Sequence, residues 1–325
     1  MIPRCQVTPL ADSVFSFEVD SRVLLQWNAA SRYQRPFFFP VYGPGQALMT
    51  RMGHPGAADH DHHNSIWFAH HKVLGIDFWG IASKAQIKQL RWHAMRDGLE
   101  EAVLAVQLGW YDGHDPQALL EQELVIAVVP DKEGEGWSVE LQSRFIPTAE
   151  SLEFQQTNYG FLAVRVAKSI SAHFGGGKLT NSHGAEGEPA IFGKPADWVD
   201  YSGAVRPTTE EISPAEKPVE VTAGITYFNH PDNPNSPVSW HVREDGWMGA
   251  GACLTAPLVT ERKQPLLLRY LLHVHSGAVD LIAANQRLER WRKLPAYQVG
   301  KSTRKHEQFD VWRRFREFAN PKCRN

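Results

Sequence analysis

Short runs of apolar residues, many of them alternating with polar ones, recur along most of the chain. Turn-forming pieces such as GPG at 43–45, DKEGEG at 131–136 and NHPDNPNSP at 229–237 separate them. Runs of this kind between Gly, Pro and Asn clusters are typical of β-strands. The predicted strands cover residues 13–20, 22–28, 36–43, 102–110, 120–129, 137–146, 161–167, 223–229 and 266–277.

A helical period is convincing only near the end of the chain, at residues 285–294 and 307–318. Strands that follow one another without intervening helices indicate antiparallel sheets. We therefore expect an all-β fold, a large antiparallel β-sandwich with a short helical C-terminal tail. The expected division is a single β-sandwich domain over 1–284, which carries the site, and a basic helical tail over 285–325. The polar, proline-bearing segment 205–219 reads as a loop between strands.

The amino-acid composition limits the classes of protein to which the chain can belong. The chain has 325 residues, 42% of them hydrophobic and 22% charged, which are globular proportions. Its net charge of −2 favours neither nucleic acid nor an anionic membrane as a partner. Residues 285–325 nevertheless hold twelve Lys or Arg against four Asp or Glu, so we expect the tail to dock onto the acidic body or onto a second subunit. This leaves a homo-oligomer open.

Several kinds of site have no support. The three cysteines form no CxxC pair, and no GxGxxG, GxSxG or HExxH motif occurs. There is no apolar signal segment at the N-terminus and no apolar run long enough to cross a membrane, so a cytoplasmic location is expected.

The segment from 52 to 80 carries a histidine cluster, with six of the fifteen histidines between His54 and His71. In an extended segment His60 and His62 would point to one face, and a second His-x-His pair, His273 and His275, lies on a predicted strand. Convergence of the two pairs would make a metal site, with His60, His62 and His275 as candidate ligands. The same pattern is also compatible with a plain loop whose histidines hydrogen-bond the backbone. Because apolar SIWFAHH and DFWG follow directly, the cluster abuts a packed core, which favours a functional role.

Two further segments combine polar and aromatic residues. The first, residues 229–247 (NHPDNPNSPVSWHVREDGW), joins amides, carboxylates, a guanidinium group and indoles. The second, residues 181–203 (NSHGAEGEPAIFGKPADWVDYSG), holds His183, Trp198, Asp200 and Tyr201. Such groups bind sugars, through hydrogen bonds to hydroxyls and stacking on the C–H face of the ring. Loops of this kind on a β scaffold are common places for a binding site.

Several segments, taken in their order along the chain, resemble the soluble bacterial family labelled "methane oxygenase PmoA-like". They are RPFFFPVYGP (35–44), DHDHHNSIWFAHHKVLGIDFW (59–79), Arg165 after FLAV, ADWVDYSG (196–203) and the segment 228–247. The resemblance covers residues 35 to about 280. It implies a sugar-associated β-sandwich, for which the galactose-mutarotase supersandwich is the nearest fold analogy.

The leading hypothesis is a carbohydrate- or glycoside-processing enzyme that uses histidine general acid–base chemistry in a concave β-sheet pocket. It requires no cofactor, and its partner is a small-molecule sugar or glycoside. The expected catalytic residues are His62, His63 and His71, with Asp77 orienting an imidazole. The expected substrate-binding residues are Arg165, Trp198, His230, Asn233, Trp240, His241 and Arg243.

Two alternatives stay open. One is a metal-dependent oxygenase or hydrolase with a transition metal or zinc on the histidine cluster. The other is a sugar-binding protein without catalysis. In every case the histidine cluster and the segment 229–243 are predicted to line one pocket.

Overall fold

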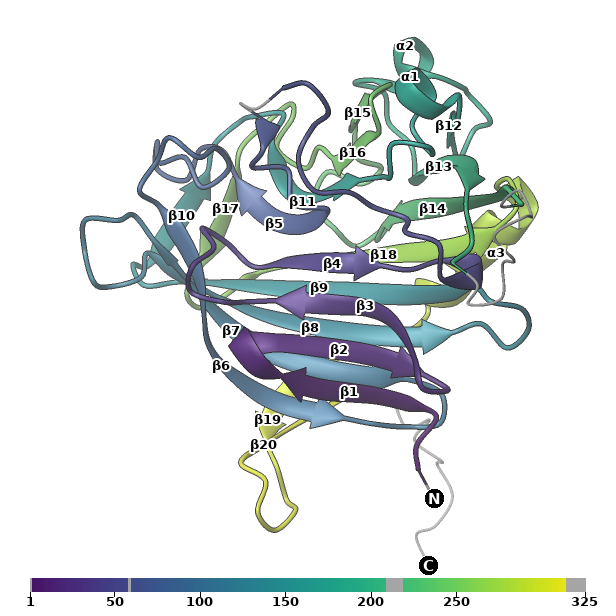
Figure 1. Ribbon diagram of the computed structural model, residues 1–325. Helices are drawn as coiled ribbons and strands as arrows, with labels where there is room; N and C mark the ends of the chain where they lie inside the picture. The colour runs from purple at the N-terminus through teal and green to yellow at the C-terminus, as the bar shows by residue number, and fades with distance from the viewer. Residues whose placement is uncertain (1, 58–59, 209–218, 314–325) are drawn as a thin grey trace, which may run out of the picture.

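Two antiparallel sheets face each other in the computed structural model of the chain (Figure 1). The structure describes residues 2–57, 60–208 and 219–313. The first sheet follows the order β1 (Cys5–Leu10), β2 (Val14–Val19), β3 (Arg22–Asn28), β4 (Phe37–Val41), β5 (Ile66–His70), β11 (Gly160–Arg165), β16 (Trp247–Ala250) and β15 (Trp240–Arg243). The predicted all-β sandwich is therefore confirmed.

The second sheet is built from the longest strands of the chain. Its order is β12 (Lys178–Asn181), β13 (Trp198–Val205), β14 (Val221–Asn229), β18 (Leu266–Ser276), β9 (Trp137–Pro147), β8 (Leu120–Pro130), β7 (Ala102–Tyr111) and β6 (Gln86–Arg96). Two strand pairs lie outside the two sheets, β10 (Ser151–Phe154) with β17 (Leu258–Glu261) and β19 (Tyr297–Lys301) with β20 (Phe309–Arg313). The helices are α1 (Ala172–Gly175), α2 (Glu188–Ile191) and α3 (Leu281–Trp291). Each strand predicted from the pattern overlaps a strand of the structure.

The hydrophobic core fills the space between the two sheets. Phe68 on β5 contacts Tyr270 on β18, and the Tyr227 hydroxyl on β14 donates to the Leu162 carbonyl on β11. Because side chains alternate along a strand, the residues next to these core positions point to the outer faces of the sandwich.

The outer face of the second sheet is covered as well, which explains why β7 is buried on both sides. Val103 and Ala105 lie beneath Tyr297 and Val311 of the β19–β20 hairpin. At the other end of the sheet, α3 packs its Trp291 against the cluster that holds Trp198 and Phe228. The sheet thus buries apolar side chains on both faces.

The predicted helical tail is half right. Helix α3 forms where the first helical pattern was found, but the expected domain boundary at residue 284 falls inside it. The second predicted helix, 307–318, is wrong where the structure describes it, because residues 309–313 form a strand. Val311 on this strand is fully buried in the hydrophobic cluster that also contains Tyr297. The spacing of Phe, Trp and Arg in this segment resembles a helical period and so hid the strand.

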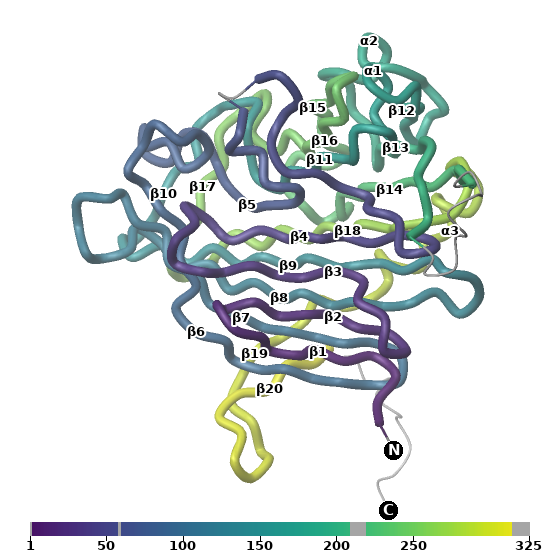
Figure 2. Tube along the Cα trace, in the orientation of Figure 1, coloured from purple at the N-terminus to yellow at the C-terminus, as the bar shows by residue number. Residues whose placement is uncertain are grey.

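The tail docks onto the body through its basic residues, as the charge distribution suggested. Arg313 pairs with the buried Glu140 and lies over the Tyr297 ring, and Arg287 pairs with Asp131. Figure 2 shows the hairpin at the opposite end of the molecule from β15 and β16. No helix in the described ranges is long and apolar enough to cross a bilayer.

The hairpin provides a stability test. Replacing Tyr297 with Ala should lower the free energy of unfolding by about 3 kcal/mol, because the ring is fully buried and its hydroxyl bonds Glu101. The neighbouring Gln298 is exposed, so Gln298→Ala should change it by no more than about 0.5 kcal/mol. Urea titrations of both variants measure the difference. Equal effects would show that the hairpin does not seal this face.

Candidate functional site

A pocket of about 460 Å³ opens on the outer face of the first sheet, at its β5–β11–β16–β15 end. Four histidines of the 54–71 cluster line it together with residues from three distant segments. The lining residues are His60, His62, His63, His71, Asp77, Trp79, Gly80, Tyr159, Arg165, His241, Arg243, Asp245 and Trp247. The prediction that the histidine cluster and the segment 229–243 line one pocket is confirmed.

The register of the strands explains this convergence. Arg165 on β11 lies opposite Trp247 on β16, which lies opposite Arg243 on β15. In the same way His241 lies opposite Gly249. Residues directly opposite each other in an antiparallel pair share a face, so these rows present two arginines, an indole and an imidazole to the same side.

The histidines reach the pocket from a turn and not from a strand, which corrects the expected alternation. The His60 amide donates to Ala57, and the His63 amide donates to His60, so the backbone coils tightly here. Consequently, the rings of His62 and His63 are neighbours, with centroids 4.4 Å apart, and the rings of His60 and His63 lie 5.0 Å apart. Among the described residues, no group of three or more His, Cys, Asp or Glu is arranged to hold a metal ion.

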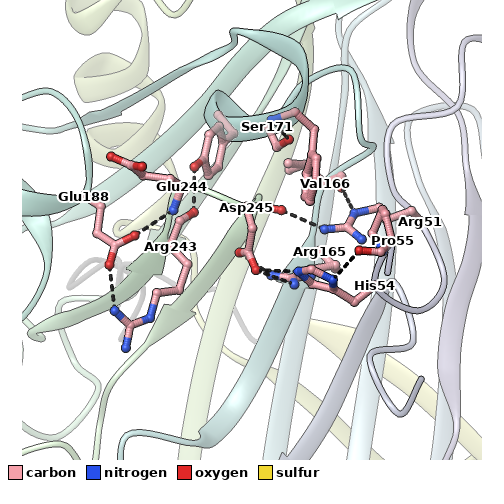
Figure 3. A network of polar contacts seen from close by, with 12 residues as sticks. Arg51, His54, Pro55, Arg165, Val166, Ser171, Glu188, Arg243, Glu244 and Asp245 are labelled. Atoms are coloured by element: carbon pink, nitrogen blue, oxygen red, sulfur yellow. Dashed lines mark hydrogen bonds and ion pairs between the residues drawn. The ribbon is translucent and has the colours of Figure 1, made fainter. Parts of the chain in front are cut away.

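An ion pair joins the two sides of the pocket floor (Figure 3). Arg165 donates from both terminal nitrogens to the Asp245 carboxylate, at 2.7 and 2.8 Å, and its side chain is only 1% exposed. His54 Nε2 lies 2.9 Å from the same carboxylate. Burial raises the pKa of Asp245, but the bonds and charge of Arg165 and then His54 outweigh it, so the pKa ends below its ordinary value.

Asp245 sits at the tip of the β15–β16 hairpin, where the backbone is held firmly. Gly246 adopts a φ of 98°, and a Cβ there would come within 2.9 Å of Val166 and 3.0 Å of Ser171. Only glycine fits this position without strain. The Val166 amide donates to the Gly246 carbonyl, and Arg51 donates to the Asp245 carbonyl.

A second carboxylate, Asp77, faces His71 across 4.0 Å. Its Oδ1 accepts hydrogen bonds from the backbone amides of Trp79 and Gly80, which leaves Oδ2 on the side of the imidazole. The buried Arg35 donates to the Phe78 and Trp79 carbonyls and so fixes the turn that carries Asp77. The sequence predicted that Asp77 orients an imidazole without saying which one, and the structure places the His71 ring opposite it.

Aromatic rings form the apolar wall. Trp79 lies 5.4 Å from both Trp67 and Trp247, measured between ring centroids, and 5.7 Å from Tyr159. Trp67 is fully buried beneath the other rings. Trp79, Trp247 and Tyr159, with their rings tilted against one another, therefore supply the aromatic contacts that were expected from Trp198 and Trp240.

Two of the lining histidines are held neutral. Burial, followed by the charge of Arg165, lowers the pKa of His63 to about 2. Burial also lowers the pKa of His241 to about 4, although its Nδ1 bonds the Asn158 carbonyl. With so low a pKa, His63 does not change its charge near neutral pH, which argues against the acid–base role expected of it.

Neither of the tryptophans assigned to the substrate, Trp198 and Trp240, lines the pocket. Trp240 precedes His241 on β15 and so points into the core, where its Nε1 donates to the Ala196 carbonyl. Trp198 faces α3 and donates to Asn285. Strand alternation turns Trp240 away from the pocket, whereas Trp198 belongs to β13 of the second sheet.

His230 and Asn233 are structural as well. His230 Nε2 lies 3.0 Å from an Arg269 nitrogen, and its ring packs edge-on against Trp291. Asn233 bonds both the amide and the carbonyl of Arg269. The loop therefore folds back onto β18, and only its end, with His241 and Arg243, reaches the pocket.

His275 lies in a different cavity, of about 220 Å³, between α3 and the outer face of the second sheet. Its Nε2 is 2.8 Å from the fully buried Asp200, and the neighbouring His273 pairs with Asp131. The two His-x-His pairs therefore do not converge, and the proposed metal set His60, His62 and His275 is not assembled.

Five pocket residues were not predicted from the sequence as members of the site. They are Trp79, Gly80, Tyr159, Asp245 and Trp247. Trp79 and Trp247 stood inside segments already singled out, whereas a lone Asp after Arg-Glu gave no signal of its pairing with Arg165.

The fold and the site define an all-β sandwich with a polar, aromatic-walled pocket on one outer face. The chain belongs to a family of unknown function, DUF6807, whose model matches residues 15–289. That range contains every residue of the pocket. No curated protein matches the chain.

The Arg165–Asp245 pair should dominate the stability of the floor. Asp245→Asn removes the charge opposite a buried guanidinium and should lower the free energy of unfolding by about 2–3 kcal/mol, less than for a fully buried pair because Asp245 is 28% exposed. Glu188→Gln at the half-exposed Arg243–Glu188 pair is the matched control, with an expected loss below about 1 kcal/mol. Chemical denaturation measures both, and a larger loss for Glu188→Gln would contradict this ranking.

Proposed function

We propose that the protein is an enzyme that acts on a carbohydrate or glycoside by histidine acid–base chemistry in this pocket. The observation that carries the proposal is the His71–Asp77 pair, which shares one pocket with the Arg165–Asp245 pair and with the aromatic surface of Trp79 and Trp247. A sugar needs these three elements, which are a proton acceptor, polar groups for its hydroxyls and a flat apolar face.

His71 is the proposed proton carrier. Its side chain is 38% exposed and faces the pocket, and Asp77 can orient the ring and stabilise the imidazolium after proton uptake. Asp77 is itself oriented by two backbone amides, so a change of protonation at His71 need not move the carboxylate. The base takes a proton from a hydroxyl or from a carbon beside a carbonyl group.

The neutral histidines serve a different purpose in this proposal. His63 and His241, with lowered pKa values, remain uncharged at neutral pH. His63 can take part with one donor and one acceptor, whereas His241 donates from Nδ1 to the Asn158 carbonyl and so keeps Nε2 as an acceptor for a hydroxyl group. The volume of about 460 Å³ lies within the usual range of about 300–1,000 Å³ for small-molecule sites. The resemblance to the PmoA-like family adds a sugar-associated β-sandwich context by analogy.

The mechanism is tested by replacing the proton carrier and its partner. His71→Gln and Asp77→Asn should each abolish turnover in a screen of aldoses, uronates and aryl glycosides. Both should leave the melting temperature within about 2 °C of the parent, because the two side chains are partly exposed and Asn keeps an acceptor for the backbone amides. The exposed His114→Gln is the control and should retain full activity.

Treatment of the unmodified protein with a chelator separates the alternatives in the same experiment. Unchanged activity and melting temperature are expected. A melting temperature that falls with chelator would favour the metal-dependent oxygenase or hydrolase instead. Sugar binding without turnover by any tested substrate, equal in parent and His71→Gln, would favour a binding protein and contradict the catalytic proposal.

A further inference from the structure

We propose that the ligand of this pocket carries a carboxylate, as a uronate or another sugar acid does. The inference rests on the proposed function and names its substrate class. It follows from the balance of charges around the floor and from the state of the hydrogen-bond acceptors that line the pocket.

The charged groups that line or directly support the pocket are not balanced. Four guanidinium groups face three carboxylates. The guanidinium groups belong to Arg35, Arg51, Arg165 and Arg243, and the carboxylates to Asp77, Asp245 and Glu188. The Arg243–Glu188 pair at the rim is neutral, so one positive charge in excess resides deeper in the site.

The excess charge comes from the buried arginines. Arg51 donates to the carbonyls of Val166, Gly53 and Asp245, and Arg35 donates to those of Phe78 and Trp79. Each is therefore solvated by neutral backbone groups without a carboxylate of its own. Burial lowers the pKa of both to about 10, which leaves them charged at neutral pH.

The carboxylates that do line the floor are already engaged. Both oxygens of Asp245 accept from Arg165, and Oδ2 also faces His54. Oδ1 of Asp77 accepts two backbone amides, while Oδ2 faces His71. Among the carboxylate oxygens of the floor, Oδ2 of Asp77 is therefore the main one left as an acceptor for the hydroxyl hydrogens of a neutral sugar.

By contrast, several side-chain nitrogen atoms at the floor are not engaged in hydrogen bonds. Nδ1 of His63, Nε of Arg165 and Nε1 of Trp247 are buried and have no hydrogen-bond partner among the described residues, although all three residues line the pocket. Each of these side chains is more than nine-tenths buried. At the rim, Arg243 uses Nη1 for Glu188 and is 47% exposed. Arg165 Nε and Trp247 Nε1 are donors, and His63 Nδ1 is a donor in the tautomer that carries its proton there. Together with the positive charge of the arginines, these donors suit an acceptor-only anionic group, since arginine binds carboxylates well.

The test compares matched neutral and acidic sugars on the full-length protein. Isothermal titration with D-glucose and D-glucuronate, and with D-galactose and D-galacturonate, should show at least one acid binding about ten-fold or more tightly than its neutral partner at about 20 mM salt. The advantage should shrink at about 200 mM salt, and the methyl ester of that acid should lose it.

A variant pair assigns the effect to the pocket. Arg243→Gln should weaken binding of the acid about ten-fold and binding of the neutral sugar less than about two-fold. Arg262→Gln, the same change at an exposed arginine outside the pocket, should alter neither. Both side chains are exposed, so both variants should fold.

The other outcomes have definite meanings. If neutral sugars bind as tightly as the acids, or the methyl ester binds as tightly as the acid, the inference is overturned while the proposed function stands. An equal loss in Arg262→Gln and Arg243→Gln would also overturn it. If neither acids nor neutral sugars bind, the inference and the proposed function fall together.

Discussion

The bidentate pair between Arg165 and Asp245 is the interaction on which the site depends. It links β11 to the tip of the β15–β16 hairpin, and through His54 it also anchors the turn that carries His60, His62 and His63. Three segments that are remote in sequence are thus held around one carboxylate (Figure 3). A guanidinium that is only 1% exposed needs such a partner, because an unpaired buried charge costs several kcal/mol.

The pair is possible because the sandwich leaves one outer face available for it. The core-facing residues of β11 and β16, such as Leu162 and Met248, pack between the sheets, so their neighbours Arg165 and Trp247 must point outward. The second sheet uses its own outer face differently, since α3 and the β19–β20 hairpin cover it. The outer face of the second sheet is thus packed against these elements, whereas the outer face of the first sheet bears the pocket.

Much of the fold could be predicted from the sequence, because alternation and turn residues report directly on strands. The site was predictable only in part. Seven of the residues expected at the site line the pocket, since dense polar clusters beside apolar runs indicate one. They are His62, His63, His71, Asp77, Arg165, His241 and Arg243. Trp240 was misplaced because both faces of its strand are buried, so the pattern does not reveal which side the indole takes. Trp198 was misplaced because the pattern does not reveal which sheet its strand joins. Asp245 owes its role to a pairing across eighty residues that no local pattern encodes.

The central claim is that ligand binds on the outer face of the first sheet, against Trp79 and Trp247. The most direct measurement is a ¹⁵N spectrum of the tryptophan indoles, assigned with Trp→Phe variants, during titration with D-glucose and D-glucuronate. The account predicts that the Trp79 and Trp247 signals shift while those of Trp198 and Trp240, buried away from the pocket, stay in place. Shifts at Trp198 or Trp240 with unchanged Trp79 and Trp247 would contradict it.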